Sequence, residues 1–210
     1  FIAYLGSKPL LSLSNSYTAN LASQQKIARR LEQQAWLRNG QTELAEQVLG
    51  QLTLNLLGRN ILQFFAQYMG SAVAALYVRE EHGGLKRVAT YGFSREQEQR
   101  EQSIYSDEGI VGQAAQLDRL IRLDDVPVDY FKVSSGLGEG ATRSVLVMPT
   151  SDDDRVNGVI ELGFLRPLEE RDVELVELIA GNVGTSIEAA RYRQRLQEVL
   201  AETQQLNEEL

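Results

Sequence analysis

The stretch Asp107–Val126, DEGIVGQAAQLDRLIRLDDV, decides how the rest of the chain is interpreted. An acidic turn that ends at Gly109 precedes a helix start of small residues, and a charged turn then leads into a short alternating strand, Leu120–Leu123. Gly112 and the two alanines that follow it let a helix lie close to the surface that it covers. Pro127 is then expected to end the strand, because proline cannot donate a hydrogen bond to a sheet ladder. The stretch holds no nucleophile beside a base and no cluster of metal ligands, so it predicts the wall of a small pocket.

Two hairpins of apolar strands are predicted on either side of this stretch. The first turns at Glu80–Gly84, where glycines supply positive φ angles, and the second turns at the polar segment Ser151–Asp154. A short strand, Ser103–Tyr105, leads into the central stretch, and Val128–Thr142 has the glycine-rich chemistry of a loop. The hairpin strands are Ala72–Arg79 with Leu85–Tyr91, and Ser144–Pro149 with Arg155–Phe164.

Long helices are predicted at both ends of the chain. In the first, Gly40 is expected to cause a local irregularity, because glycine costs roughly 1 kcal/mol relative to alanine in a helix interior. A second helix ends at Gly70. The last helix starts at Pro167–Glu170, where acidic residues suit its positive end, and it runs to Leu210. From Ala189 onward its apolar positions alternate by three and four over roughly three heptads, which is typical of a coiled coil.

These seams favour a homodimer that forms through both terminal helices, with the two chains running in parallel. The direction of pairing stays open, since an apolar seam serves parallel and antiparallel pairs alike. The expected contact residues are Leu37, Leu44, Val48, Tyr192, Leu196, Val199, Leu206 and Leu210.

The order and spacing of these pieces resemble the GAF domains of bacterial sensor kinases. The resemblance runs from about Leu52 to about Arg191 and begins with the acidic-Gly-Ile-Val-Gly helix start at Gly109. The segment Tyr130–Gly138 is similar to GAF domains that precede the kinase core of hybrid histidine kinases. The other matching segments are Ala74–Val78, Arg143–Pro149 and Gly158–Leu162.

The pattern of elements predicts an α+β fold, with an antiparallel sheet of five or six strands and the terminal helices on one face. The segments Gly109–Leu117 and Pro127–Gly140 are expected to cover the other face as a lid. We divide the chain into a helical linker at 1–51, a GAF-like sensory domain at 52–191 and the start of a coiled-coil signalling helix at 192–210.

The resemblance implies a ligand cavity between the sheet and the lid. Aromatic side chains with a few polar groups suit a small and mostly apolar ligand. Equally, the side chains could fill the cavity so that nothing binds. The candidate pocket residues are Tyr77, Tyr91, Phe93, Tyr105, Ile110, Tyr130, Phe131, Val145, Val147 and Glu161.

Composition argues against several other classes. The net charge of −8 disfavours nucleic acid and anionic membranes as partners. No apolar run is long enough to span a bilayer, and residues 1–6 are open to interpretation as the end of a transmembrane helix, a cloning scar or an ordinary helix start. The single histidine, His82, lies in a turn without a partner for catalysis or zinc binding. The chain has no cysteine, which sets aside a free methionine sulfoxide reductase on the same fold. We therefore expect no catalytic residues, no metal and no cofactor.

The sequence is best interpreted as a cytoplasmic sensory GAF module of a two-component signalling protein, with a parent protein that is a histidine kinase anchored in the inner membrane. Ligand or partner binding would be relayed to the output kinase through dimeric helices. The alternative is a ligand-free interaction and dimerisation module that receives its signal from another protein, such as a second sensor kinase. The ligand, the partner and the output pathway stay open.

Overall fold

The computed structural model describes residues 7–99, 103–105, 108–127, 131–135 and 138–208, in two compact units, 1–39 and 40–210. The first unit is the N-terminal part of helix α1 (Ser7–Gln47). Its apolar side chains Leu21, Ile27 and Leu31 are 40%, 55% and 60% exposed. These three apolar positions of the helix therefore face solvent.

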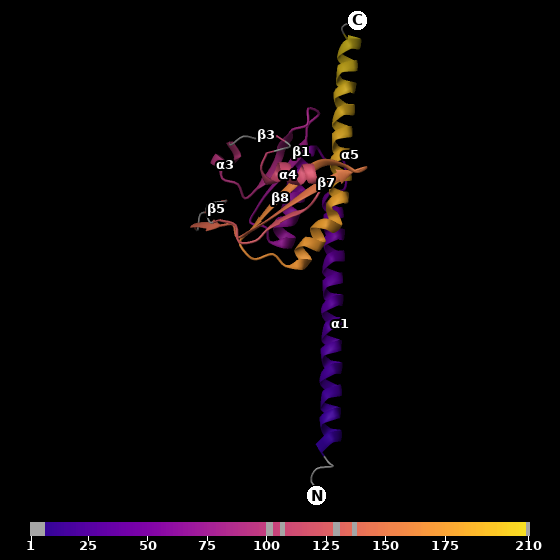
Figure 1. The fold of residues 1–210 in the computed structure, drawn as a ribbon. Helices are drawn as coiled ribbons and strands as arrows, with labels where there is room; N and C mark the ends of the chain where they lie inside the picture. The colour runs from indigo at the N-terminus through magenta and orange to yellow at the C-terminus, as the bar shows by residue number, and fades with distance from the viewer. Residues whose placement is uncertain (1–6, 100–102, 106–107, 128–130, 136–137, 209–210) are drawn as a thin grey trace. The chain divides into compact units, whose positions relative to one another are not determined.

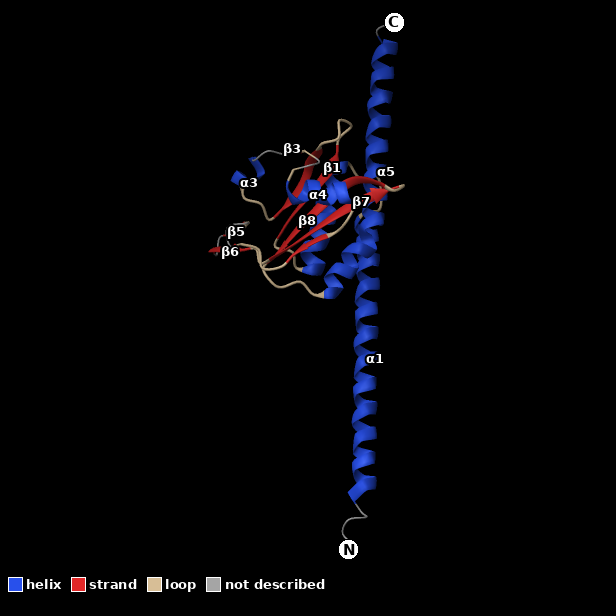
Figure 2. Ribbon diagram, viewed as in Figure 1, coloured by secondary structure: helices blue, strands red, loops and turns tan. Residues whose placement is uncertain are grey.

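The second unit is built on a six-stranded antiparallel sheet in the order β3-β2-β1-β8-β7-β4 (Figures 1 and 2). A separate two-stranded sheet pairs β5 with β6. The predicted α+β fold is thus confirmed. The strands are β1 (Val73–Arg79), β2 (Leu85–Tyr91), β3 (Ser103–Ile104), β4 (Ile121–Leu123), β5 (Lys132–Ser135), β6 (Gly138–Ala141), β7 (Ser144–Asp152) and β8 (Arg155–Phe164).

Both predicted hairpin turns form where the sequence placed them. In the β7–β8 turn, Asp153 and Asp154 both have positive φ, 47° and 60°, as a tight two-residue turn between twisted strands requires. In the β1–β2 turn, Gly83 has φ 92° and its N–H donates to the carbonyl of Glu80. These turns fix the pairing of β1 with β2 and of β7 with β8.

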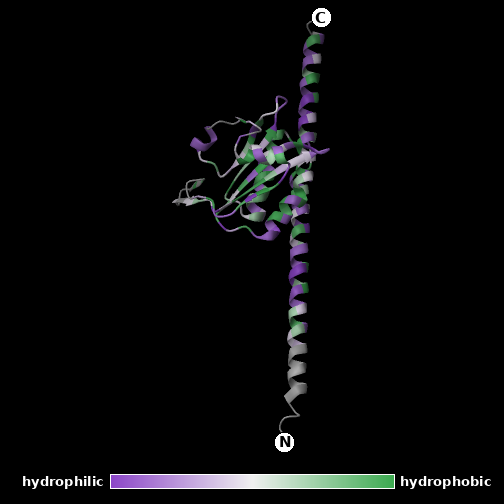
Figure 3. Ribbon diagram, viewed as in Figure 1, coloured by the Kyte–Doolittle hydropathy of each residue, from purple (hydrophilic) through white to green (hydrophobic). Residues whose placement is uncertain are grey.

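Three helical segments cover one face of the sheet: α2 (Leu54–Phe64), the π-helical turn η1 (Phe65–Met69) and α5 (Glu170–Glu208). The hydroxyl of Thr53 caps α2 by accepting from the N–H of Leu56. Gly70 ends the helical run with φ 73°, as predicted. Figure 3 shows that the central strands beneath are mainly hydrophobic.

A charged pair fixes the start of α5. Both guanidinium nitrogens of Arg166 donate to the carboxylate of Asp172, at 2.7 and 2.9 Å, and Arg166 also donates to the carbonyl of Met69. The same carboxylate accepts from the N–H of Glu169 and so caps the first turn. Asp172 is only 1% exposed, so this pair is part of the packed end of the helix layer.

The opposite face is covered by α4 (Gly109–Leu117), and α3 (Arg95–Gln99) lies beside β2. Among the described residues, no helix is both apolar enough and long enough to cross a membrane.

Strand β4 ends at Leu123, as predicted, and Asp125 with φ 52° turns the chain before Pro127. Two local predictions were wrong. The predicted loop Val128–Thr142 contains the β5–β6 hairpin, because its glycines permit a strand turn as well as an open loop. Helix α1 passes through Gly40 without a break, and a Cβ there would lie 2.8 Å from Tyr68 and 2.9 Å from Leu175. At Gly40, α1 therefore packs closely against Tyr68 and Leu175.

Candidate functional site

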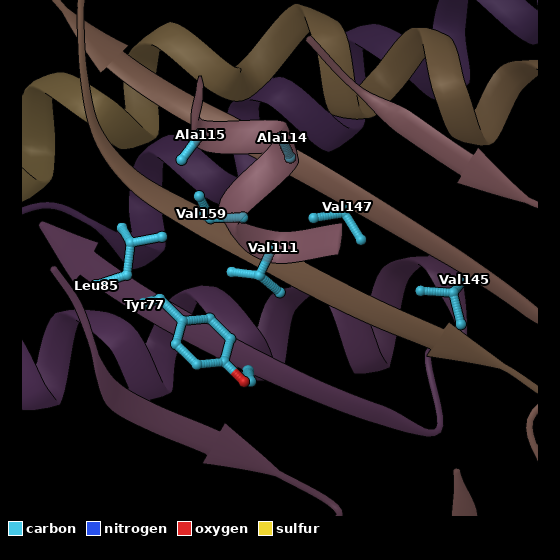
Figure 4. Packing of buried hydrophobic residues seen from close by; sticks show 9 residues of the cluster. Tyr77, Leu85, Val111, Ala114, Ala115, Val145, Val147 and Val159 are labelled. Carbon is cyan, nitrogen blue, oxygen red and sulfur yellow. The ribbon is translucent and has the colours of Figure 1, made fainter. Parts of the chain in front are cut away.

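The candidate site lies between α4 and the sheet face that it covers (Figure 4). Strand side chains Ala75, Val147 and Val159 form the floor, and α4 places Val111, with Ala114 and Ala115, directly on it. All six are at most 5% exposed. The small residues of α4 let its backbone approach the sheet closely, as the sequence predicted.

Polar side chains interrupt this apolar floor at the centre of the sheet. In the strand register, Glu161 lies opposite Ala75 and Val147, so its side chain is on the α4 face. Tyr77 lies opposite Arg87 on the same face. A carboxylate, a phenol and a guanidinium therefore share one region of an otherwise hydrophobic surface.

Burial, and to a lesser extent the negative charge of Glu161, raise the pKa of Tyr77 to about 12, while Arg87 opposes both effects. The phenol consequently stays protonated at neutral pH and can donate a hydrogen bond. Arg87 is itself held in place, because its Nη2 donates to the carbonyls of Gln97 and Glu98 at 3.3 and 2.8 Å. Its guanidinium carbon lies 5.3 Å from the ring centre of Phe93, a cation–π distance.

A small cavity of about 20 Å³ lies against this floor. The rings of Phe93 and Phe131, with centres 5.1 Å apart, lie together at its wall. Since one water needs roughly 10–15 Å³, this cavity has room for about one water and is too small for a metabolite. It is lined by Val73, Ala74, Ala75, Phe93, Phe131, Thr142, Val145, Glu161 and Gly163.

A larger and more open pocket of about 490 Å³ lies at the start of α4. That volume is within the range of small-molecule sites. It is lined by Ser103, Ile104, Glu108, Gly109, Ile110, Val111 and Glu161. Among the described residues, Glu161 lines both this pocket and the small cavity.

Seven of the predicted pocket residues are brought together by the fold. Tyr77, Val145 and Val147 belong to the buried cluster, Phe93 and Ile110 pack against it, and Phe131 and Glu161 line the cavities. Tyr105, by contrast, is 72% exposed and lines neither cavity. Tyr130 lies outside the described residues.

Tyr91 was predicted to line the pocket, but a bulge in the sheet places it on the opposite face. The β1–β2 ladder carries a bulge, because Tyr77 pairs with Arg87 whereas Leu76 pairs with Ala89. The extra residue moves Ala89 and Tyr91 to the α2 face, and Tyr91 is 40% exposed there.

Arg87 is the polar residue of this face that the sequence prediction missed. Counting back from the β1–β2 turn gives Arg79 opposite Leu85, and two steps further Tyr77 opposite Arg87. That count was open to sequence reasoning, because the turn and both strands had been placed.

The predicted dimer-contact residues fall into two groups. Tyr192, Leu196, Val199 and Leu206 of α5 are 45–64% exposed, and Leu37 of α1 and Val48, just after α1, are partly exposed. Leu44, in contrast, is 1% exposed and packs in the core of its own chain, so it cannot contact a second copy in this arrangement. Leu210 lies outside the described residues.

Comparison with known proteins agrees with this geometry. A family model described as GAF domain matches residues 51–188, more than half of the chain. No curated protein matches the sequence closely enough to count as a relative.

Several solved structures share the fold. The GAF domain of a phosphoenolpyruvate-protein phosphotransferase from Coxiella burnetii has a TM-score of 0.63 at 18% identity, covering 76% of this chain and 96% of its own. The corresponding Acinetobacter domain has a TM-score of 0.60 at 17% identity, covering 78% and 98%. Free methionine-R-sulfoxide reductase from Neisseria meningitidis, in complex with its substrate, has a TM-score of 0.56 at 18% identity, covering 77% and 91%. At these identities the likeness shows the fold alone.

Proposed function

Because the chain belongs to the GAF domain family, we propose that it is a sensory module that binds a small ligand between α4 and the sheet. The observation that carries this proposal is the position of Glu161, which lines both the small cavity and the larger pocket at the start of α4. A carboxylate that lines both spaces offers a polar group to a ligand on an otherwise apolar face, which supports a binding role for it.

The proposed output is a change in the packing or register of α5. For that to occur, the ligand must bind two arrangements of the helix with different affinity. The exposed apolar residues Tyr192, Leu196 and Val199 support pairing with a second copy, since they repeat along α5 by three and four. We place this module in a two-component histidine kinase on the cytoplasmic side of the membrane, and we assign no catalytic step to it.

The ligand hypothesis is tested by a thermal-shift screen of small metabolites against the 210-residue chain. A ligand at 100 times its Kd should stabilise the fold by about 2.7 kcal/mol, because it binds only the folded state. Each hit is then repeated with Glu161→Gln, which should lose most of the shift, and with Glu177→Gln on the exposed side of α5 as the matched control. Equal shifts in all three proteins would place the ligand elsewhere.

The dimer hypothesis is tested by sedimentation. The double substitution Leu196→Asp with Leu206→Asp places charges on the exposed seam of α5 and should make self-association at least tenfold weaker. A double variant that stays fully dimeric would show that this seam is not the interface.

A second candidate function is a ligand-free interaction module that receives its signal from another protein, such as a second sensor kinase. The small volume of the cavity beside Phe93 and Phe131 favours it. Under this alternative, Asp124→Lys near the lid should weaken binding to the cognate kinase while the melting temperature changes little. Unchanged binding would remove that surface from consideration.

A further inference from the structure

The tip of the β7–β8 hairpin contacts α4, which covers the candidate site, and α5, the proposed output helix. The ladder shifts register between Thr150 and Ser151, because Thr150 pairs with Gly158 and Ser151 with Val156, so the extra residue of this bulge is Asn157 on β8. The side chain of Ser151 then meets the end of α4, and its backbone meets α5. The end of β7 reaches the α5 helix in Figure 2.

On the α4 side the contact is a single hydrogen bond. Asp118 is the residue that ends α4, and it adopts the left-handed conformation with φ 44°. Its N–H closes the last turn by donating to the carbonyl of Ala114. The hydroxyl of Ser151 donates to Oδ1 of Asp118 at 3.1 Å, so the end of α4 is tied to the hairpin tip.

On the α5 side the contact is a close approach of two backbones. A Cβ at Gly184 would lie 2.1 Å from the carbonyl oxygen of Ser151 and 2.7 Å from its nitrogen, so only glycine fits. Backbone atoms cannot rotate away as a flexible side chain can. A displacement of Ser151 toward α5 would therefore have to move the helix.

Buried hydrogen bonds hold this approach in place. Nδ2 of Asn157 donates to the carbonyl of Gly184 at 2.8 Å, and the hydroxyl of Thr150 donates to Oδ1 of Asn157 at 3.1 Å. Thr150 and Asn157 are 0% and 6% exposed. At the rim, the hydroxyl of Thr185 donates to Oδ1 of Asp152 at 2.8 Å. Satisfied buried polar groups favour one discrete arrangement over gradual sliding.

We propose that Ser151 couples α4 to α5, so that a displacement of the end of α4 is passed through the hairpin tip to the helix at Gly184. This inference deepens the proposed function, on which its biological meaning rests, because α4 covers the candidate ligand site and α5 is the proposed output. The coupling itself is a property of the empty protein. It can therefore be measured without knowing the ligand.

The test is hydrogen exchange by mass spectrometry on the 210-residue chain. Gln113 is exposed on α4, so Gln113→Gly loosens that helix roughly fivefold through helix propensity without touching the core. The coupling predicts that amides of α5 around Gly184 then exchange about threefold faster, while those of β1 do not change. An unchanged α5, or an equal rise in α5 and β1, would overturn the proposal.

The second half of the test removes the link. With Ser151→Ala, the added Gln113→Gly should leave exchange in α5 unchanged, whereas with the control Ser186→Ala the threefold rise should persist. Ser186 is a matched control, because its hydroxyl bonds only within α5, to the carbonyl of Asn182. The same rise in the Ser151→Ala background would show that α4 reaches α5 by another route. A failed ligand screen with intact coupling would count against the proposed function alone.

Discussion

The two faces of the sheet differ in how closely their side chains pack. On the helix-covered face, Leu76, Leu146 and Ile160 lie under α2 and α5 and are 0% exposed. On the α4 face, Tyr77 and Glu161 bring polar atoms into the middle of the sheet, and two cavities lie beside Glu161. The difference teaches that one face supplies stability while the other keeps room and polar groups for recognition.

The glycines support the same contrast. On the helix face they mark places where two backbones nearly touch, as at Gly184, or where a helix meets a strand, as at Gly58, whose Cβ would lie 2.8 Å from that of Ala89. At the start of α4, a Cβ on Gly109 would meet nothing within 4 Å. The chain is therefore open at the start of α4, whereas it is closely packed at Gly58 and Gly184.

The largest expected effect is truncation on the helix face. Phe65 is 0% exposed, so Phe65→Ala should lower the free energy of unfolding by about 3–5 kcal/mol, through lost burial and the cavity left behind. Urea denaturation measures it. The control Leu178→Ala on exposed α5 should change it by less than about 0.5 kcal/mol. A cost for Phe65 below about 1 kcal/mol would contradict the contrast between the faces.

A smaller effect is expected from two glycines on one helix. Gly184→Ala should destabilise the protein by about 2–3 kcal/mol, since the new methyl group collides with the backbone of Ser151. Gly181→Ala, where nothing lies within 4 Å, should instead stabilise it by about 0.5–1 kcal/mol through helix propensity. Thermal or urea unfolding shows whether each substitution lowers or raises the free energy of unfolding. Equal effects would mean that α5 does not approach β7 as described.

Truncation on the α4 face should cost less than on the helix face. Phe93 is only half-buried beside the small cavity, so Phe93→Ala should lower the free energy of unfolding by about 1–2 kcal/mol. The same urea experiment measures it beside Phe65→Ala. A cost equal to that of Phe65 would show that both faces are packed alike.

The smallest effect is a pH dependence. The pKa of Tyr77 is raised to about 12 in the folded chain, against an ordinary value near 10, so the folded state keeps a proton that the unfolded state loses. The contribution of Tyr77 to the free energy of unfolding is therefore fully present below pH 10. It is lost as pH rises toward 12, and the loss from pH 9 to pH 11 is about 1 kcal/mol. Tyr77→Phe should show a correspondingly shallower fall in urea denaturation. Identical slopes would mean that Tyr77 is not buried beside Glu161.

Much of the sheet followed from the sequence because its strands are bounded by strong turn signals. Strands β2 and β8 begin and end where they were predicted, since Gly83 and the Asp153–Asp154 pair leave little freedom for the turns. The β5–β6 hairpin was not predicted, because glycines at 136, 138 and 140 favour a loop and a strand turn equally well.

Residues of the candidate site were placed on the correct face only where side chains alternate regularly between the two faces of a strand. Tyr77, Val145 and Val147 were assigned correctly to the α4 face, because each lies on a strand with regular pleating there. Tyr91 was not, since the bulge after Arg87 reverses the alternation and no residue in β2 announces it. Leu44 was assigned to a dimer seam because helical spacing alone does not distinguish a seam from a core.

The most direct test of ligand binding on the α4 face is native mass spectrometry of the 210-residue chain as purified from its host, together with Glu161→Gln. We expect a small molecule bound at up to one copy per chain, and we expect the substitution at Glu161 to reduce its occupancy severalfold. If the wild-type chain carries no molecule and gains none from a metabolite mixture, the α4 face is a packed surface, and the interaction module becomes the better description.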